Sequence, residues 1–248
     1  MSNIHLKINK KLNLQIPKFV CDDNPLQWNH LNSYPMLQHF NAYSFDCYCG
    51  KPASGKTSLL ISFLTGKGKN KVYRKCFNHV YVIMPTSSRE SMQKNPFKNH
   101  DPEKLYDELT FDIIEEIYNK LLNSSSEKEN SLLILDDVTA SLKSKEIQKI
   151  FRSIIYNRRH LKCKIIILVQ SYQSIPREIR KIINNIVIFK PSKIEFEILM
   201  DELISKKKDI ALELLKFYEQ KHDYLMLNVD SQRIYKNFDE IIIDENNI

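Results

Sequence analysis

The residues whose chemistry is easiest to identify form the eight-residue stretch GKPASGKT at Gly50–Thr57. It matches the phosphate-binding pattern G-x-x-x-x-G-K-[ST] in full, and two of the chain's 4 glycines occupy its fixed positions. Glycine lets such a loop curl until successive backbone N–H groups point at phosphate oxygens. The pattern predicts that Lys56 reaches the β- and γ-phosphates of ATP and that Thr57 binds Mg²⁺. The residues expected to contact the nucleotide are Gly50, Lys51, Pro52, Ala53, Ser54, Gly55, Lys56, Thr57 and Ser58.

Two adjacent carboxylates follow a short apolar stretch further along the chain. Leu132–Leu135 (LLIL) has the composition of a buried strand, and Asp136 and Asp137 come directly after it. In phosphate-loop enzymes the acid that ends this strand belongs to the Mg²⁺ shell, which makes Asp136 the second metal-side candidate. Asp137 then stands where an acid would position and deprotonate the attacking water. A helix N-cap or a turn is the alternative role for such a pair, and the phosphate loop earlier in the chain favours hydrolysis.

Polar and basic residues near strand ends complete the predicted site. Gln170 follows the apolar stretch Lys164–Val169, a strand expected to lie between the loop strand and the acidic strand. Its amide is placed to sense the γ-phosphate or to orient the water, and the alternative is a solvated amide at a strand end. Arginines supply transition-state charge in many ATPases, and in ring ATPases one often comes from the neighbouring subunit. The candidates for that role are Arg158 and Arg159 first, followed by Arg177 and Arg180.

The segments around these residues alternate between strand and helix. Strands made almost wholly of apolar residues are covered on both faces, and strands that alternate with helices form a parallel sheet. The sequence therefore predicts an α/β fold on a central, mainly parallel sheet flanked by helices. The strands are expected at 44–49, 79–84, 132–135, 164–169 and 185–189, the helices at 56–65, 103–122, 144–157, 177–183, 194–205 and 210–220, and a hairpin at 224–228 and 232–238.

The domain organisation follows from these elements. Residues 1–43 are expected to be an N-terminal extension that packs on the core, and 44–191 to be the ATPase core. Residues 192–248 would add helices and the hairpin to the same domain. The stretch NSSSEKEN at 123–130 is predicted to be a flexible connector, and the acidic tail FDEIIIDENNI at 238–248 to be frayed.

Composition narrows the class of protein. The chain has 37 Lys and Arg against 30 Asp and Glu, which gives a formal net charge of +7. Lys67–Lys75 carries five basic residues and no acid, and Ser141–Lys164 carries eight with a single glutamate. Such basic stripes favour binding to a nucleic-acid backbone, and a solvated surface is the alternative.

Apolar runs and cysteines bear on where the protein is found. No apolar run approaches the ~18 residues of a membrane span, and the 5 cysteines are scattered, so we expect a cytosolic protein with reduced cysteines and no membrane insertion.

Three stretches together resemble a known family. They are GKPASGKTSLL at 50–60, LLILDDV at 132–138 and NRRHLKCKIIILVQSYQSIPREIRKIINNIVIF at 157–189, and HDYLMLN at 222–228 is a fourth similar piece. Over about residues 40–240 the chain resembles the virion DNA-packaging ATPases of large DNA viruses, the poxvirus-like branch of the FtsK–HerA class. It departs from that pattern at Pro52 and Ala53, where glycine or serine is usual, and at Asp137, where glutamate is usual. These departures could slow hydrolysis without preventing it.

The resemblance implies a RecA-like fold, a homo-oligomeric ring, and ATP hydrolysis with Mg²⁺ that drives double-stranded DNA into a preformed capsid. In such a motor Lys56 and Thr57 would hold phosphate and Mg²⁺, Asp136 and Asp137 would form the acidic pair, and Gln170 would be the sensor. A capsid or portal vertex would be the docking partner, with the protein in the host cytoplasm at the viral assembly site and in the virion. The residues leave two alternatives open: a P-loop nucleotide kinase, and a nucleotide-binding capsid-docking module that hydrolyses nothing.

Overall fold

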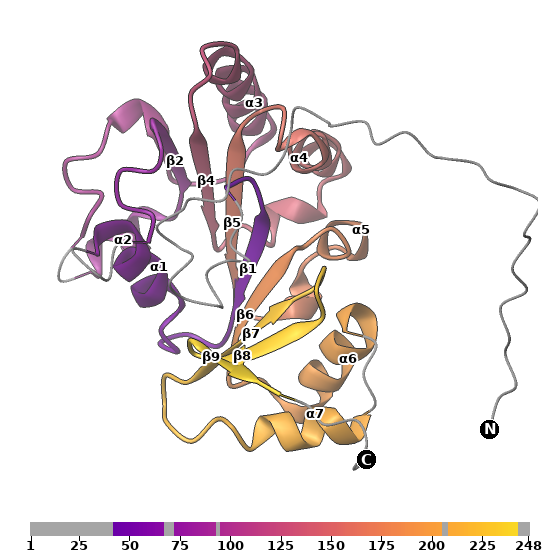
Figure 1. Cartoon of the computed structure of the whole chain (residues 1–248). Coiled ribbons are helices and arrows are strands. Elements are labelled where there is room, and N and C mark those ends of the chain that lie inside the picture. Colours follow the sequence, from indigo (N-terminus) through magenta and orange to yellow (C-terminus); the bar gives the residue numbers. More distant parts are fainter. Residues whose placement is uncertain (1–41, 67–71, 93–94, 205–207, 243–248) are drawn as a thin grey trace, which may run out of the picture.

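The computed structural model describes residues 42–66, 72–92, 95–204 and 208–242, which form a nine-stranded sheet with helices on both faces (Figure 1). The strands follow one another in space in the order β3-β2-β4-β5-β1-β6-β7-β8-β9. The first six strands pair in parallel, and β7, β8 and β9 extend the sheet in antiparallel fashion. Their bounds are β1 Phe45–Cys49, β2 His79–Ile83, β3 Leu105–Tyr106, β4 Ser131–Asp136, β5 Cys163–Val169, β6 Asn185–Phe189, β7 Tyr224–Asn228, β8 Arg233–Lys236 and β9 Asp239–Ile241.

Helices cover the two faces of this sheet unequally. One face packs against α1 and the chain around Val72 and Phe97, and the other packs against α3 to α7. Because side chains alternate along a strand, Phe45, Cys47 and Cys49 of β1 face the larger helical layer and Tyr48 faces α1. The helices are α1 Lys56–Thr65, α2 Thr86–Glu90, α3 Phe111–Ser126, α4 Lys145–Asn157, α5 Arg177–Arg180, α6 Lys193–Leu203 and α7 Lys208–Leu215, with short 3₁₀ turns at Pro102–Lys104, Ser141–Lys143 and Tyr172–Ser174.

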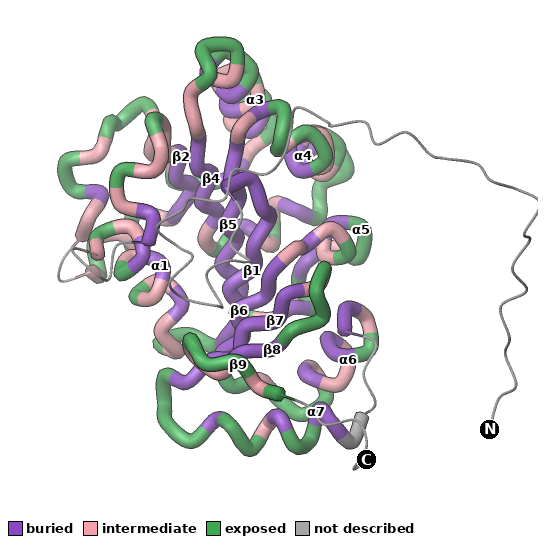
Figure 2. Tube along the Cα trace, in the orientation of Figure 1, coloured by how far each residue is buried: buried purple, intermediate pink, exposed green. Residues whose placement is uncertain are grey.

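The central strands are buried on both faces (Figure 2). Every residue of β1, β5, β6 and β7 is buried, which is the pattern that uniformly apolar strands predict. The mainly parallel α/β fold predicted from the sequence is therefore confirmed. No helix in the described part of the chain is both long and apolar enough to cross a membrane.

A chain of polar side chains crosses the sheet within this apolar centre. Lys164 of β5 pairs with Asp46 of β1 at 2.6 Å, and both side chains are fully buried. Asn185 of β6 donates to the other oxygen of Asp46 at 2.7 Å and accepts from Asn228 of β7 at 2.8 Å. The ammonium of Lys164 also donates to Ser44 at 2.6 Å. These contacts tie four adjacent strands together at one level of the sheet.

Two sequence predictions were wrong in their bounds. The helix expected at 103–122 begins at Phe111, where the Thr110 hydroxyl accepts a hydrogen bond from the backbone N–H of Ile113. Before it lie a 3₁₀ turn and β3, which pairs with β2. The same helix continues through Ser126 into the predicted connector, where the serine hydroxyls bond to carbonyls of their own helix.

The predicted hairpin is present as β7 and β8, and a third strand follows it. At the start of the tail expected to be frayed, Asp239–Ile241 instead forms β9, and residues 243–248 lie outside the described residues. Asn237 adopts a left-handed backbone with φ of 53°, which allows the tight turn between β8 and β9. The extension predicted at 1–43 lies outside the described residues except for Ala42 and Tyr43, which are buried.

Breaking the buried ion pair should destabilise the fold strongly. Lys164→Met would leave the carboxylate of Asp46 buried without its cation, and losing one partner of such a pair typically costs about 3–5 kcal/mol. We expect the free energy of unfolding, measured by urea denaturation, to fall by about that amount. The double variant Asp46→Asn/Lys164→Met removes both charges and should recover most of the loss.

The matched control is Lys216→Met, which removes one member of an exposed pair with Glu213. Such pairs contribute about 0–1 kcal/mol. A loss for Lys164→Met no larger than that of the control would contradict the role given to the buried pair.

Candidate active site

The phosphate loop connects the carboxyl end of β1 to α1. Its first residue, Gly50, donates its N–H to the carbonyl of Val169 at the end of β5, at 3.1 Å. A Cβ at Gly50 would lie 2.8 Å from both the Phe189 Cβ and the Ser54 Oγ, so only glycine fits there. Gly55 has φ of 115°, a left-handed conformation that side chains rarely adopt. The two glycines of the motif are thus required by sterics and by backbone shape respectively.

Lys56 begins α1 and turns its side chain back over the loop. Its ammonium donates to the carbonyl of Gly50 at 2.5 Å and to that of Lys51 at 3.1 Å. Only 9% of the residue is exposed, and burial lowers the pKa of its amine, while the charges of Asp136 and Asp137 act in the opposite direction. The cation therefore lies in the concave side of the loop, where a phosphate group would need it.

Asp136 and Asp137 lie where β4 ends, as predicted. Burial raises the pKa of Asp136 to about 6, while Lys56 opposes the rise and Asp137 adds to it. Asp137 is exposed and has a left-handed φ of 57°. A left-handed backbone is uncommon outside glycine, asparagine and aspartate, and such conformations collect at functional sites. The two acids therefore differ: one carboxylate is half-buried beside Lys56 and the other faces solvent.

Gln170 is exposed directly after β5, and β5 lies between β1 and β4 as the sequence predicted. The carboxyl ends of parallel strands meet at one edge of a sheet, so Gln170 shares an edge with the phosphate loop and the acid pair. The bond between Gly50 and Val169 joins this strand end directly to the loop. The structure thus brings the predicted loop, acids and glutamine to a single edge.

Glu195, in the first turn of α6, is a site residue that the sequence reasoning missed. Its carboxylate accepts from the Ser171 hydroxyl at 2.6 Å and from the backbone N–H of Tyr172 at 2.8 Å. It also lies 4.0 Å from the thiol of Cys49, the last residue before the phosphate loop. Glu195 therefore clamps the segment after Gln170 onto α6 next to the loop. The only signal in the sequence is its place three residues after Ser192, whose hydroxyl caps this helix.

The arginine candidates lie elsewhere. Arg158 follows α4 and precedes β5, at the edge of the sheet opposite the loop, and donates to Ile155 at 2.8 Å and Asn184 at 3.1 Å. Burial lowers the pKa of its guanidinium. Arg159 and Arg177 are exposed, whereas Arg180 forms a two-pronged pair with Glu202. The structure does not bring Arg158 or Arg159 to the nucleotide site of their own chain.

The cysteines take no part in a metal site in the described structure. Cys47, Cys49 and Cys163 are buried in the core, as the apolar strands around them predict. Among the described residues no group of three or more His, Cys, Asp or Glu side chains could hold a metal ion.

Comparison with known families identifies the chain. The family described as Poxvirus A32 protein matches residues 38–245, which include the phosphate loop, the acid pair and Gln170. The chain belongs to the poxvirus A32 protein family. This confirms the poxvirus-like resemblance drawn from the sequence. No curated protein sequence gives a significant match to the chain.

Solved structures share the fold of this A32-family chain. The genome packaging NTPase B204 from Sulfolobus turreted icosahedral virus 2, in complex with AMP, has a TM-score of 0.58 at 14% identity, covering 82% of this chain and 100% of that one. Its complex with ATP-γS has a TM-score of 0.58 at 15% identity, covering 81% of this chain and 99% of that one. The DNA-packaging ATPase B204 from Sulfolobus turreted icosahedral virus has a TM-score of 0.58 at 16% identity, covering 81% of this chain and 98% of that one. These likenesses confirm the RecA-like P-loop fold.

Asp136→Asn should stabilise the protein at neutral pH. The pKa of this carboxyl is raised from its ordinary 3.8 to about 6 in the folded chain, so the folded state binds the proton more tightly than the unfolded state. The free energy of unfolding of the wild type should therefore fall as pH rises between these two values. The asparagine variant, with no charge to bury, should be more stable by about 3 kcal/mol above this interval and equally stable below it.

Urea denaturation across a pH series measures this difference. Asp137→Asn, which removes the neighbouring exposed carboxylate, controls for the loss of one negative charge. An Asp136→Asn variant that is less stable than the wild type at neutral pH would show that the carboxylate is not penalised by burial.

Proposed function

We propose that this A32-family protein is an ATP-hydrolysing motor that moves double-stranded viral DNA into a preformed capsid. The observation that carries the proposal is the convergence of Lys56, Asp136 and Gln170 at one edge of the sheet, with β5 between β1 and β4. Proteins of the same fold are described as genome packaging NTPases, which supports it. The capsid or portal vertex would be its docking site, in the host cytoplasm and the virion.

The cation that the proposal requires is Mg²⁺, held by Thr57 and Asp136. The fit rests on Asp136, a half-buried carboxylate whose pKa is raised by burial and which a divalent cation would stabilise in its charged form. Thr57 supplies a half-buried hydroxyl from the first turn of α1. Hard oxygen donors of this kind suit Mg²⁺, which when bound neutralises charge on the β- and γ-phosphate oxygens.

The chain's own residues would carry the hydrolysis. Loop N–H groups and Lys56 bind the phosphates and hold them in place. Asp137, which is exposed, accepts a proton from a water molecule while the oxygen of that water attacks the γ-phosphorus. The bond between the γ-phosphorus and the leaving oxygen of ADP breaks in the same step. Gln170 orients that water. Aspartate is one methylene shorter than the glutamate usual in the class, and the left-handed backbone of Asp137 sets the direction of this shorter side chain.

The contacts of Glu195 would couple loss of the γ-phosphate to movement of α6. The carboxylate holds Ser171 and Tyr172 directly after Gln170, and Glu202 on the same helix accepts from the Tyr172 hydroxyl at 3.0 Å. Segments ordered by γ-phosphate contacts shift when those contacts are lost. A displacement of Gln170 would therefore be passed to α6.

A ring explains the position of the arginines. Arg159 is exposed at the edge of the sheet opposite its own phosphate loop, so it could complete a site only on a neighbouring subunit. Arg158, already bonded to Asn184, would hold this corner in shape. In the proposed ring Arg159 is thus the stronger candidate for the residue that acts in trans.

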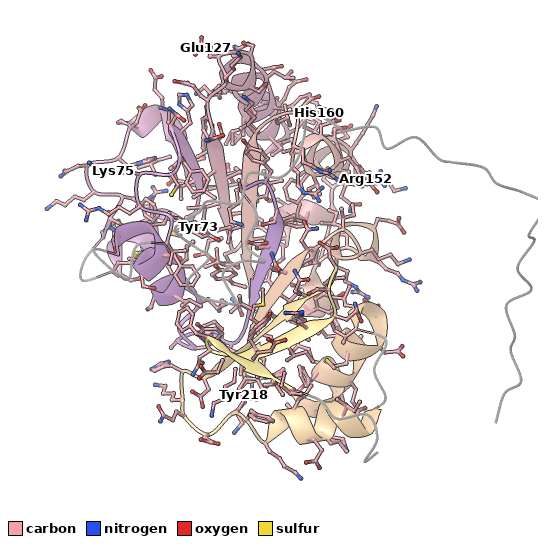
Figure 3. All side chains as sticks on the ribbon, in the orientation of Figure 1. Tyr73, Lys75, Glu127, Arg152, His160 and Tyr218 are labelled. Carbon is pink, nitrogen blue, oxygen red and sulfur yellow. The ribbon has the colours of Figure 1, made fainter. Side chains whose placement is uncertain are left out.

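The outer face of α4 is the proposed DNA-facing surface. Of the eight basic residues in 141–164, Lys164 is buried with Asp46 and Arg158 is half-buried. Of the other six, four are exposed and Arg152 and Lys162 are half-buried, and Figure 3 shows Arg152 and His160 on this side of the molecule. Tyr156, 64% exposed, lies among them. The basic residues proposed for this surface are Lys143, Lys145, Lys149, Arg152 and Lys162, since Arg159 is the candidate that acts in trans. In the other basic cluster, 67–71 lie outside the described residues.

Two substitutions separate binding from hydrolysis. Lys56→Ala removes the phosphate-binding cation and should abolish ATP turnover. Asp137→Asn should keep ATP binding but lower turnover by at least about 100-fold, because it removes the general base. Turnover is measured with and without linear duplex DNA, and we expect DNA to stimulate the wild type and the control but neither site variant. Asp201→Asn, an exposed carboxylate on α6, is the control.

Other outcomes would favour the alternatives. Normal turnover by Asp137→Asn would remove the water-positioning role. Phosphate transfer to a nucleoside monophosphate, with no response to DNA, would favour a nucleotide kinase. Absent turnover in the presence of DNA would favour a docking module.

Charge reversal on α4 tests the DNA-facing surface. Lys149→Glu/Arg152→Glu should leave ATP binding unchanged and weaken DNA binding, because it removes two cations that would contact DNA phosphates. Each lost contact should also make the plot of log affinity against log salt less steep by about 1. Lys181→Glu/Lys216→Glu reverses two exposed charges away from α4 and serves as control. Equal DNA affinity in both double variants at several salt concentrations would place the DNA elsewhere.

A further inference from the structure

A pocket of about 200 Å³ lies between the end of α1 and the amino-terminal half of β2. Its lining is mostly apolar and aromatic, and Leu64, Phe77 and Val80 in it are half-buried, so part of this apolar surface is open. Apolar cavities of about 150 Å³ bind benzene, whereas sites for small-molecule ligands begin at about 300 Å³. The pocket therefore has room for one aromatic ring of a larger partner and is too small for a whole nucleotide.

The pocket is separate from the nucleotide site. Leu64 comes eight residues after Lys56 on α1, so it lies about 12 Å along the helix from the phosphate loop. Val80 is the second residue of β2, near the amino edge of the sheet, whereas the phosphate loop, the acids and Gln170 share the carboxyl edge. None of the residues proposed to bind ATP lines the pocket.

Contacts among its own residues hold the walls of the pocket in place. The ring Nε2 of His100 donates to the carbonyl oxygen of Val80 at 2.7 Å. The rings of Phe97 and His100 meet edge to face, with centroids 5.9 Å apart. The rings of Tyr73 and Phe77 also lie 5.9 Å apart between centroids. A guest ring would therefore meet aromatic walls that are already formed, and aromatic pairs favour such contacts.

The rim of the pocket is basic. The two chain segments that border it, residues 64–78 and 92–100, carry five and two Lys or Arg side chains respectively and no acid. Arg74, Lys75 and Lys98 are the members of this set in the described part of the chain, and none of the three forms an ion pair with a described residue. A positive rim around an apolar hollow is complementary to an acidic partner.

Lys75, which lines the pocket, has a backbone conformation that suits glycine. Its φ is 60° at the third position of a tight turn, in which the Cys76 N–H donates to the carbonyl of Tyr73 at 3.1 Å. Turns that need a positive φ at this position favour glycine or asparagine. A lysine there costs stability, and residues kept in such conformations collect at functional sites. The exposed ammonium at the rim is what a glycine would not supply.

The two basic clusters of the chain lie on opposite faces of the sheet. Leu64, Phe77 and Val80 pack on the face covered by α1, whereas α4 packs on the other face. Figure 3 accordingly shows Lys75 and Arg152 on opposite sides of the molecule. A duplex lying on α4 is therefore separated from the pocket by the sheet. A duplex also keeps its bases stacked inside, so it offers phosphates but no ring to fill an apolar hollow.

We propose that this pocket docks a protein partner by taking one aromatic side chain that the partner presents between acidic residues, with Lys75 and the neighbouring cations pairing with those acids. The inference rests on the proposed function, because a motor that pulls DNA must be held by the shell it fills, and the pulling surface cannot also be the anchor. The capsid or portal vertex would carry this acidic aromatic segment. The anchor would then lie on the face of the sheet away from α4.

Short peptides test this chemistry. In an NMR titration of the full chain labelled with ¹⁵N, the peptide acetyl-EEFEE-amide should shift the signals of Phe97 and His100. It should bind at least about 10-fold more tightly than acetyl-EEAEE-amide, which lacks the ring, and than acetyl-KKFKK-amide, which reverses the charge. Lys75→Glu should weaken binding of the acidic peptide about 5-fold or more, and should leave DNA-stimulated ATP turnover within about twofold of the wild type.

Lys75→Gly separates binding from structure. Glycine relieves the left-handed backbone, so this variant should unfold at a higher urea concentration than the wild type while binding the acidic peptide more weakly. The matched control is Lys128→Gly, because Lys128 is exposed, has φ of 64° and lies in the turn after α3, away from the pocket. The control should gain stability in the same way and keep the wild-type affinity.

The outcomes distinguish this inference from the proposed function. No shift with the acidic peptide, equal affinity for the peptides with and without the ring, or unchanged affinity in Lys75→Glu would overturn the docking pocket and leave the motor intact. The pocket would also be overturned if single-stranded oligothymidylate, and not the peptide, shifted the signals of Phe97 and His100, because it would then hold a nucleobase. Absent ATP turnover by the wild type with DNA would overturn the proposed function, whatever the peptides show.

Discussion

The buried ion pair between Asp46 and Lys164 is the constraint on which the site depends. A charge with no exposure must be paired, so β1 and β5 have to be neighbours and in the register that brings these two side chains together. That register places the end of β5 against the start of the phosphate loop, where Gly50 bonds to Val169. A pair at one end of two strands thereby fixes the relation of Gln170 to the loop at their other end. Purely apolar neighbours would leave this register less well defined.

The same edge of the sheet combines rigid and responsive parts. Lys56 and the loop belong to the rigid part, since the glycines of the loop admit no side chain and its cation is bonded to its own backbone. The segment after Gln170 belongs to the responsive part, because side chains of α6, not strand pairing, hold it. Asp136 connects the two energetically: burial penalises its charge in the chain, and the Mg²⁺ that we propose for the site would reduce that penalty. Such destabilised groups are typical of sites that give up stability for function.

Local patterns in the sequence were enough to predict much of this. Each of three motifs spans fewer than ten consecutive residues: the phosphate loop, the acid pair with its strand, and the strand before Gln170. That they lie close together follows because parallel strands have their carboxyl ends at one edge of the sheet. Glu195 could not be found in this way, since its contacts are with Ser171 and Tyr172, more than 20 positions earlier in the chain. The start of α3 was misplaced because β3 has two residues and no apolar run. The third strand of the C-terminal hairpin was missed because its pattern is acidic, as suits an exposed sheet edge.

The position of β1 in the sheet sets the order of events while the chain is being made. Both strands that flank β1 come much later, and 120 positions separate Ser44 from its partner Lys164. When the phosphate loop has been synthesised, neither β5 nor β6 exists yet, so β1 cannot pair until most of the chain has been made. Pairing across such a distance is slow, because the entropy of closing the loop is lost before the contacts form. The nucleotide site thus cannot assemble from an N-terminal fragment, and nucleotide binding would report that synthesis has passed β6.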